Sequence, residues 1–157
     1  MAKRIGKYKI SKRESEVSLV DGGVASGPVT FSQGQQSSAV AVTATSDGLT
    51  TGIIPEGASY VTVTSAGANN IVLLPPPTVG TVVWIFVGTN GCELRAGSAT
   101  GTDASGTIAI GGNTPSADHE SALPANSLSL MVCTSATTWV GIEIASNNAV
   151  TAVEVAA

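Results

Sequence analysis

Charged side chains are scarce in this sequence: they make up 11% of its 157 residues, against about 25% in an average soluble domain. Reactive and aromatic residues are scarce too, with two cysteines, one histidine, and 4% Phe, Trp and Tyr. Two cysteines do not make a disulfide framework. Catalysis needs a nucleophile, a base or a metal site, and the chain offers little material for any of them. We therefore expect a protein that is not an enzyme.

Long apolar runs are missing as well. No stretch approaches the roughly 18 apolar residues of a membrane-spanning helix. The basic start at Lys3 and Arg4 imitates a secretory signal, but Lys7 and Lys9 interrupt the apolar stretch of ~7–15 residues that should follow. We expect neither a membrane protein nor an exported one. In that setting Cys92 and Cys133 are predicted to be free, packed thiols, with a single disulfide as the alternative.

The positive charge lies almost entirely at the amino terminus, where residues 1–13 hold six of the seven basic residues. The rest of the chain carries Arg95 and eleven acidic residues, so a basic arm is attached to an acidic body. We predict an arm at 1–13, a strand-and-loop segment at 14–48 and a β-sandwich domain at 49–157. The basic residues of the arm are Lys3, Arg4, Lys7, Lys9, Lys12 and Arg13.

Three interpretations of the arm remain open. Docking on an acidic protein surface is favoured, because Tyr8–Ser11 can extend along a strand edge and repeated weak charge pairs add up in an oligomer. A solvated tail is the second interpretation. Nucleic-acid binding comes third, because the acidic body opposes it and Tyr8 is the only nearby aromatic residue.

Alternating apolar and polar residues dominate the rest of the chain, and no helical periodicity extends over 11 residues. Short strands separated by turn residues predict an all-β fold, a jelly-roll-like antiparallel β-sandwich. The expected strands are residues 16–20, 29–31, 38–45, 59–64, 69–74, 81–87, 92–95, 107–110, 127–133 and 139–144.

Residues 81–87 are apolar on both faces of the expected strand, which predicts that both faces are covered. The turn 88–91 predicts a hairpin to residues 92–95. The second sheet is the expected cover of one face, and a loop, the N-terminal segment and a neighbouring subunit are the alternatives for the other. We assign Trp84 and Phe86 to the core and the opposite face to a subunit interface. The candidate interface residues on that face are Val83, Ile85 and Val87.

Trp139 is the fourth candidate interface residue. Alternation in residues 139–144 predicts that Val140, Ile142 and Ile144 point inward, which places Trp139 on the face of Glu143. Interfaces are enriched in tryptophan. A tryptophan at the rim, partly covered by its own loop, is an equally good interpretation.

One polar cluster has side chains that could bind a metal ion, and an exposed loop is the alternative interpretation. Asp118, His119 and Glu120 are adjacent in sequence, with Asp103 as the only obvious further ligand. A metal site needs ligands that converge from several segments, so an exposed loop is the better interpretation. We expect no catalytic residues, no metal site and no cofactor.

Residues 69–144 resemble a β-sandwich module of tailed-bacteriophage virion proteins, namely capsid decoration (cement) proteins and fibre knobs. The matching motifs are IVLLP at 71–75 before a turn with Gly80, the strand to Val87 followed by Asn90-Gly91, Gly111-Gly112 after a short strand, LPANSL at 123–128 leading a strand, and TSATTW at 134–139. The last motif closes a second hairpin, between residues 127–133 and 139–144. The resemblance implies a jelly-roll-like sandwich, a trimeric assembly and a role in the virion.

The expected function is therefore that of a non-enzymatic virion structural protein, a trimeric decoration protein that binds and stabilises a phage capsid. Its expected partners are two further copies and the major capsid protein or another shell protein, with no membrane or nucleic acid involved. Synthesis in the host cytoplasm and a place on the outer capsid surface follow from this expectation. The alternative is a receptor- or glycan-binding fibre module, for which Trp139 with Asn147 and Asn148 is the only hint.

Overall fold

The computed structural model describes residues 39–111, 114–116 and 120–153, and the predicted arm at 1–13 lies outside this range. Within the described part the regular structure consists of ten β-strands and one 3-10 turn, η1 (Thr50–Gly52). The strands are β1 (Val40–Thr43), β2 (Tyr60–Thr64), β3 (Ile71–Leu73), β4 (Val82–Val87), β5 (Cys92–Arg95), β6 (Ala109–Ile110), β7 (Ser121–Leu123), β8 (Leu128–Ser135), β9 (Thr138–Ile144) and β10 (Val150–Ala152).

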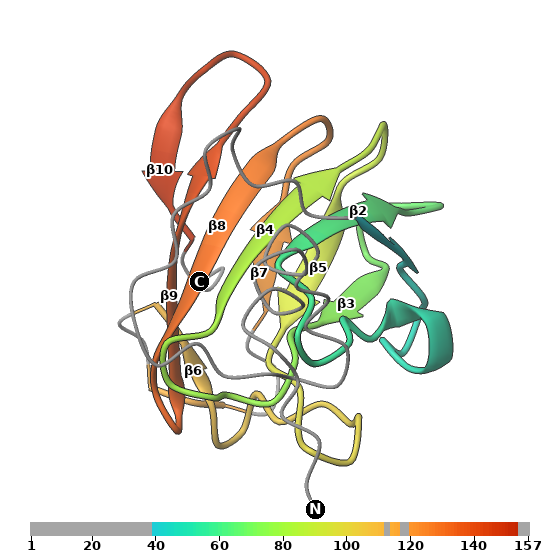
Figure 1. Cartoon of the computed structure of the whole chain (residues 1–157). Helices are drawn as coiled ribbons and strands as arrows, with labels where there is room; N and C mark the ends of the chain where they lie inside the picture. Colours follow the sequence, from blue (N-terminus) through green and yellow to red (C-terminus); the bar gives the residue numbers. More distant parts are fainter. Residues whose placement is uncertain (1–38, 112–113, 117–119, 154–157) are drawn as a thin grey trace, which may run out of the picture. The chain divides into compact units, whose positions relative to one another are not determined.

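The strands form two sheets (Figure 1). The large sheet has the order β1-β2-β4-β8-β9-β10, with β6 paired to β9 beside β10, and the small sheet has the order β3-β5-β7. The expected all-β sandwich is confirmed. Pairing is mixed rather than purely antiparallel: β1 with β2, β2 with β4, β3 with β5 and β6 with β9 are parallel.

Side chains of both sheets meet in one hydrophobic core. The large sheet contributes alternate residues of its strands. In the small sheet, most of the strand residues are buried. β3 has no polar face because all three of its residues are buried, which fits a short strand covered on both sides. The largest fully buried side chains are Trp139, Ile54, Leu73, Leu74, Ile85, Leu94, Leu123 and Met131.

The expected hairpin between β4 and β5 is wrong. The two strands belong to different sheets, so the turn at 88–91 carries the chain from the large sheet to the small one. Gly91 allows this crossing, because a Cβ atom there would lie 2.7 Å from the backbone oxygen of Leu123. The glycine is needed for close approach to β7 rather than for a two-residue hairpin.

The second expected hairpin is confirmed. β8 and β9 pair antiparallel from Leu128 opposite Ile144 to Cys133 opposite Trp139, with an irregularity between Cys133 and Ser135. Alternation in β2 is confirmed as well, with Val61 and Val63 in the core. In β2, polar residues alternate with valines and so distinguish the two faces of the strand. Between β8 and β9, polar residues mark the turn.

Candidate interaction surface

The two faces of β4 are the reverse of what the sequence suggested. Val83, Ile85 and Val87 are fully buried in the core of this chain. Trp84 and Phe86, expected in the core, are 38% and 40% exposed. The prediction that assigned Trp84 and Phe86 to the core is therefore wrong, and the exposed apolar face of β4 is the other one.

β9 is reversed in the same way. Trp139 is fully buried and Glu143 is 7% exposed, whereas Val140 and Ile142 are 38% and 45% exposed. Trp139 is thus a core residue rather than a rim residue or an exposed anchor. Its burial also separates it from Asn147 and Asn148 at an exposed turn, so the aromatic and amide cluster suggested for glycan binding is not formed there.

Packing rather than hydrophobicity explains the reversal. Close-packed interiors select side chains by volume and shape, and the inner positions of β8 and β9 alternate large with small residues. Gly141 illustrates the fit: a Cβ atom there would collide with the sulfur of Met131 and lie 2.7 Å from the carbonyl oxygen of Leu130. Large and small inner residues also face each other across the two strands, with Met131 opposite Gly141 and Trp139 opposite Cys133.

The outward side chains form continuous rows because the strand register aligns them. One row crosses the sheet from Tyr60 and a second from Thr62, and a shorter third row starts at Val82. The rows are Tyr60–Trp84–Leu130–Ile142–Ala152, Thr62–Phe86–Leu128–Ile144–Val150 and Val82–Val132–Val140. We call these thirteen residues the outer face.

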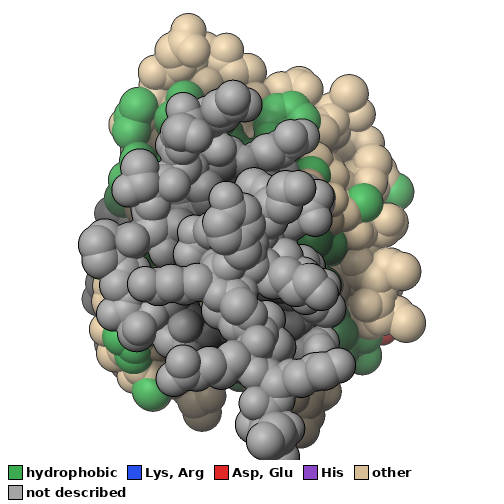
Figure 2. Space-filling model, in the orientation of Figure 1, with side chains coloured by type: hydrophobic (Ala, Val, Ile, Leu, Met, Phe, Trp, Pro, Cys, Tyr) green, Lys and Arg blue, Asp and Glu red, His purple; other side chains and the backbone are tan. Residues whose placement is uncertain are grey.

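The outer face has two properties that distinguish it from an ordinary surface. None of its residues is charged, and most are large and apolar. Its exposed large residues range from 38% at Trp84 to 62% at Val150. Six others are half-buried, namely Tyr60, Thr62, Leu128, Leu130, Val132 and Ile144. Figure 2 shows green side chains in several separate areas of the described surface in this view. Contiguous apolar patches of this kind mark interaction sites.

A separate charged cluster surrounds Arg95, on β5 of the small sheet. Its guanidinium bonds to Asp103 at 3.0 Å, Glu120 at 2.5 Å and Glu93 at 3.5 Å. Burial, then the hydrogen bond and charge of Glu120, raise the pKa of Glu93 although Arg95 acts against them. Burial would lower the pKa of Arg95, but its bonds to Asp103 and Glu120 raise it. The cluster ties loop residues to β5, and Arg95 is the only basic residue of the described part.

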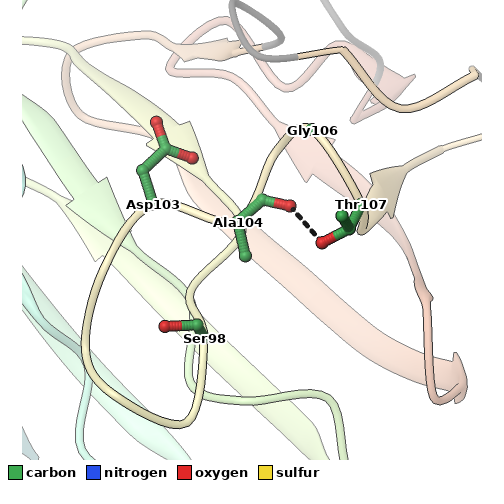
Figure 3. Close-up of a pocket in the computed structure, with 5 residues that line it drawn as sticks. All are labelled: Ser98, Asp103, Ala104, Gly106 and Thr107. Carbon is green, nitrogen blue, oxygen red and sulfur yellow. Dashed lines mark hydrogen bonds between the residues drawn. The ribbon is translucent and has the colours of Figure 1, made fainter.

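A hollow of about 470 Å³ lies beside this cluster and is lined by Ser98, Asp103, Ala104, Gly106 and Thr107 (Figure 3). Both oxygens of Asp103 are already engaged: Oδ1 accepts from the backbone and hydroxyl of Ser105, and Oδ2 accepts from Arg95. Burial raises the pKa of Asp103, but the bonds from Ser105 and Arg95 outweigh it and lower the pKa. The carboxylate holds the loop and is not free to bind a ligand.

The inner face of the large sheet holds one carboxylate. Glu143 lies opposite Ser129 on β8, and the Ser129 hydroxyl is buried without a hydrogen-bond partner among the described residues. Desolvation raises the pKa of Glu143. A charged group at this position costs stability at neutral pH.

The remaining candidates from the sequence divide into two groups. Cys92 and Cys133 are both buried and free, as expected. His119 and Asp118 lie outside the described residues, as do Lys3, Arg4, Lys7, Lys9, Lys12 and Arg13. Among the described residues no group of three or more His, Cys, Asp or Glu side chains is arranged to hold a metal ion.

Comparisons with known proteins returned no match to any protein family, to any curated protein or to any solved structure. The described part contains no helix of the length and hydrophobicity that crossing a membrane requires. Among the described residues, the uncharged outer face is the surface that best fits an interaction site.

Proposed function

We propose that the protein is a non-enzymatic structural protein that assembles into a homo-oligomer and binds a phage capsid shell as a decoration protein. The observation that carries this proposal is the uncharged apolar outer face of the large sheet. Soluble monomers rarely expose contiguous apolar patches of more than a few hundred Å². A subunit that covers the patch with a partner avoids this liability.

Composition supports the same proposal. Charged residues make up 11% of the chain, against about 25% in an average soluble domain. The core of an interface is depleted in charge and enriched in large aromatic residues. Trp84 and Phe86, together with the uncharged rows around them, have these properties.

Attachment to a shell is proposed for the basic arm. Residues 1–13 carry six positive charges, and the described part carries one. Charge contacts of this kind are screened over about 8 Å at physiological salt, so binding through the arm should weaken as salt rises. The resemblance to decoration proteins supports a virion shell, either its major capsid protein or another shell protein, as the acidic partner.

Two measurements test the proposal. The first is the native mass of the purified full-length chain, for which we expect an oligomer. A monomer at all accessible concentrations would contradict assembly.

The second measurement compares the full-length chain with a chain that starts at Glu14, in melting temperature and in co-sedimentation with undecorated phage shells. We expect equal melting, because the arm has little apolar area to bury, and loss of shell binding. Unchanged binding would remove the arm from the contact, and absence of binding by the full-length chain would contradict the decoration role.

A further inference from the structure

Glu93 and Glu120 are two carboxylates that meet at one nitrogen of Arg95. The Glu93 Oε2 atom lies 3.5 Å from Arg95 Nη2, and the Glu120 Oε2 atom lies 2.5 Å from the same nitrogen. The Arg95 Nε atom is buried and has no hydrogen-bond partner among the described residues. Neither glutamate therefore forms the two parallel bonds by which a guanidinium binds a carboxylate most strongly.

The strand register brings the two glutamates together on the face of the small sheet that points away from the core. Alternation places Glu93 and Arg95 on one face of β5 and its buried residues on the other. Glu93 lies opposite Ala122 of β7, and Glu120 directly precedes β7. A residue two positions from the directly opposite one is a diagonal neighbour on the same face, within reach of long side chains. The two glutamates are thus neighbours across the β5–β7 pair (Figure 1).

The surroundings of Glu93 make ionisation of both glutamates costly. On β3, Ile71 lies opposite Glu93 and is buried, and the Glu93 side chain itself is 15% exposed. Burial, then the hydrogen bond and the charge of Glu120, raise the pKa of Glu93. A hydrogen bond between two carboxyl groups needs a proton on one of them, because an ionised carboxylate only accepts.

We propose that Glu93 and Glu120 share one proton, and that the shared proton holds β7 against β5 more firmly in mild acid than at neutral pH. β7 is an edge strand of the small sheet and has three residues, so few backbone bonds hold it there. A hydrogen bond between the glutamates adds to these bonds, whereas two ionised glutamates repel each other and oppose them. The proposal does not rest on assembly or on shell binding, so it can fail while the proposed function stands.

The other charged groups beside the pair do not titrate in the same direction. Asp103 binds Arg95 Nη1 at 3.0 Å, and its pKa is lowered because its hydrogen bonds outweigh burial. Asp103 therefore stays ionised and holds the guanidinium in place while the glutamates titrate. Neither β3 nor β7 contains a titratable side chain. Asp118 and His119 precede Glu120 in the sequence and lie outside the described residues, so His119 is included in the test.

The direction of the pH effect follows from the raised pKa of Glu93. The stability that a raised pKa contributes is fully present below the unfolded pKa and is lost as the pH rises through the folded pKa. Detachment of β7 should therefore become more frequent as the pH rises from about 4.5. An ordinary ion pair between Arg95 and the glutamates predicts the opposite direction, because ionised glutamates would then hold β7 more firmly.

Amide hydrogen exchange of the full-length chain measures this detachment, because an amide exchanges when its segment opens locally. After correction for the pH dependence of intrinsic exchange, the protection of the β7 amides should fall between pH 5 and pH 8. The fall should be about tenfold for each unit by which the pKa of Glu93 is raised. The amides of β2, a strand without charged residues, are the internal reference and should keep their protection.

Two variants remove the shared proton. Glu93→Gln supplies an amide N–H that donates to Glu120 at every pH, so β7 should remain as protected at pH 8 as it is in the wild type at pH 5. Glu120→Gln removes the other carboxylate and should also abolish the pH dependence. PH dependence that persists in either variant would overturn the proposal. So would wild-type protection that is independent of pH or that rises with pH, a measurement that needs no variant to fold.

Two matched controls replace other groups that titrate in this range. His119→Gln removes the histidine next to Glu120 in the sequence, and Glu143→Gln removes the other glutamate whose pKa burial raises, on the large sheet. The pH dependence of β7 should persist in both controls. Its loss in His119→Gln would assign the proton to the histidine, and its loss in Glu143→Gln would assign it to the large sheet. Either loss would overturn the proposal.

Discussion

The two faces of the large sheet have similar hydrophobicity, but one is buried in the core and the other is partly exposed. On β4 the inner residues Val83, Ile85 and Val87 are fully buried, and the outer residues Val82, Trp84 and Phe86 are 38–41% exposed. The inner face also contains polar groups, with Ser129 and Glu143 on neighbouring strands. Hydrophobicity alone therefore does not determine which face enters the core. Volume fit with the opposing sheet determines it, and the apolar residues of the other face stay partly exposed in the single chain.

We expect the two faces to differ most in stability when one tryptophan on each face is replaced by alanine. Trp139→Ala removes a fully buried side chain and should cost about 3–5 kcal/mol of unfolding free energy. Trp84→Ala removes a side chain that is 38% exposed, so it should cost little in the single chain. Chemical denaturation over a series of protein concentrations distinguishes the two variants.

Concentration matters because association of folded copies adds to apparent stability. Trp139→Ala should be destabilised at every concentration, and Trp84→Ala mainly at concentrations where the wild type associates. Equal losses in both variants at high dilution would contradict the assignment of the two faces.

The second prediction concerns the fit of the inner face at Gly141. Gly141→Ala should cost about 1–3 kcal/mol through overpacking, because the added Cβ atom meets the Met131 sulfur and the Leu130 carbonyl oxygen. Gly67→Ala is the control, since no heavy atom lies within 4 Å of its added Cβ atom. Thermal unfolding should show a clear loss for Gly141→Ala and almost none for Gly67→Ala.

Much of the fold could be predicted because strand alternation and turn residues are local signals. β2, β3, β4, β5 and the β8–β9 hairpin were expected close to their observed positions. The partner of each strand was harder to predict, because strand pairing is not local. A turn with Gly91 is compatible both with a hairpin and with a crossing between sheets. Only the close approach to Leu123 decides between them.

The candidate interface residues on β4 were placed on the wrong face, because the structure buries Val83 in the core and exposes Trp84. The strand is apolar on both faces, so hydrophobicity could not assign these two residues to sides. A signal did exist in β9, where Gly141 and Trp139 share a face. A glycine beside a tryptophan on one face indicates close packing there, and weighing it would have placed Trp139 in the core.

A smaller effect on stability is expected from Glu143, the carboxylate of the inner face. Burial raises the pKa of Glu143 above 4.5, so the folded state favours its neutral form. Its contribution to stability is fully present below the unfolded pKa and is lost as the pH rises through the folded pKa. Glu143→Gln should therefore be more stable than wild type at pH 7, on the order of 1 kcal/mol, and the difference should shrink toward pH 4.

The stability contribution of Asp103 is expected to change with pH in the opposite direction. Its pKa lies below 3.8 because the bonds from Ser105 and Arg95 outweigh burial. Its contribution is present above the unfolded pKa and is lost as the pH falls through the folded pKa. Asp103→Asn should thus be less stable than wild type at pH 7, with a difference that shrinks in acid. Denaturation at pH 7 and pH 4 for Glu143→Gln, and at pH 7 and below pH 3 for Asp103→Asn, checks the two signs, and a shared sign would contradict the assignments.

The smallest effect is on thiol reactivity and leaves stability unchanged. Burial, with a further contribution from the charge of Glu93, raises the pKa of Cys92 to about 12, and burial also raises the pKa of Cys133. Because the thiolate is the reactive species, neither cysteine should react with a disulfide reagent in the native protein at neutral pH. Both should react once the unreduced protein is unfolded in denaturant.

Val132→Cys adds a thiol one residue before Cys133 but on the outer face. At dilutions where copies dissociate, this thiol should react in the native state. A Val132→Cys thiol as slow as Cys133 at those dilutions would mean that the outer face is covered within the single chain, and a missing pair of thiols after unfolding would mean a disulfide between Cys92 and Cys133.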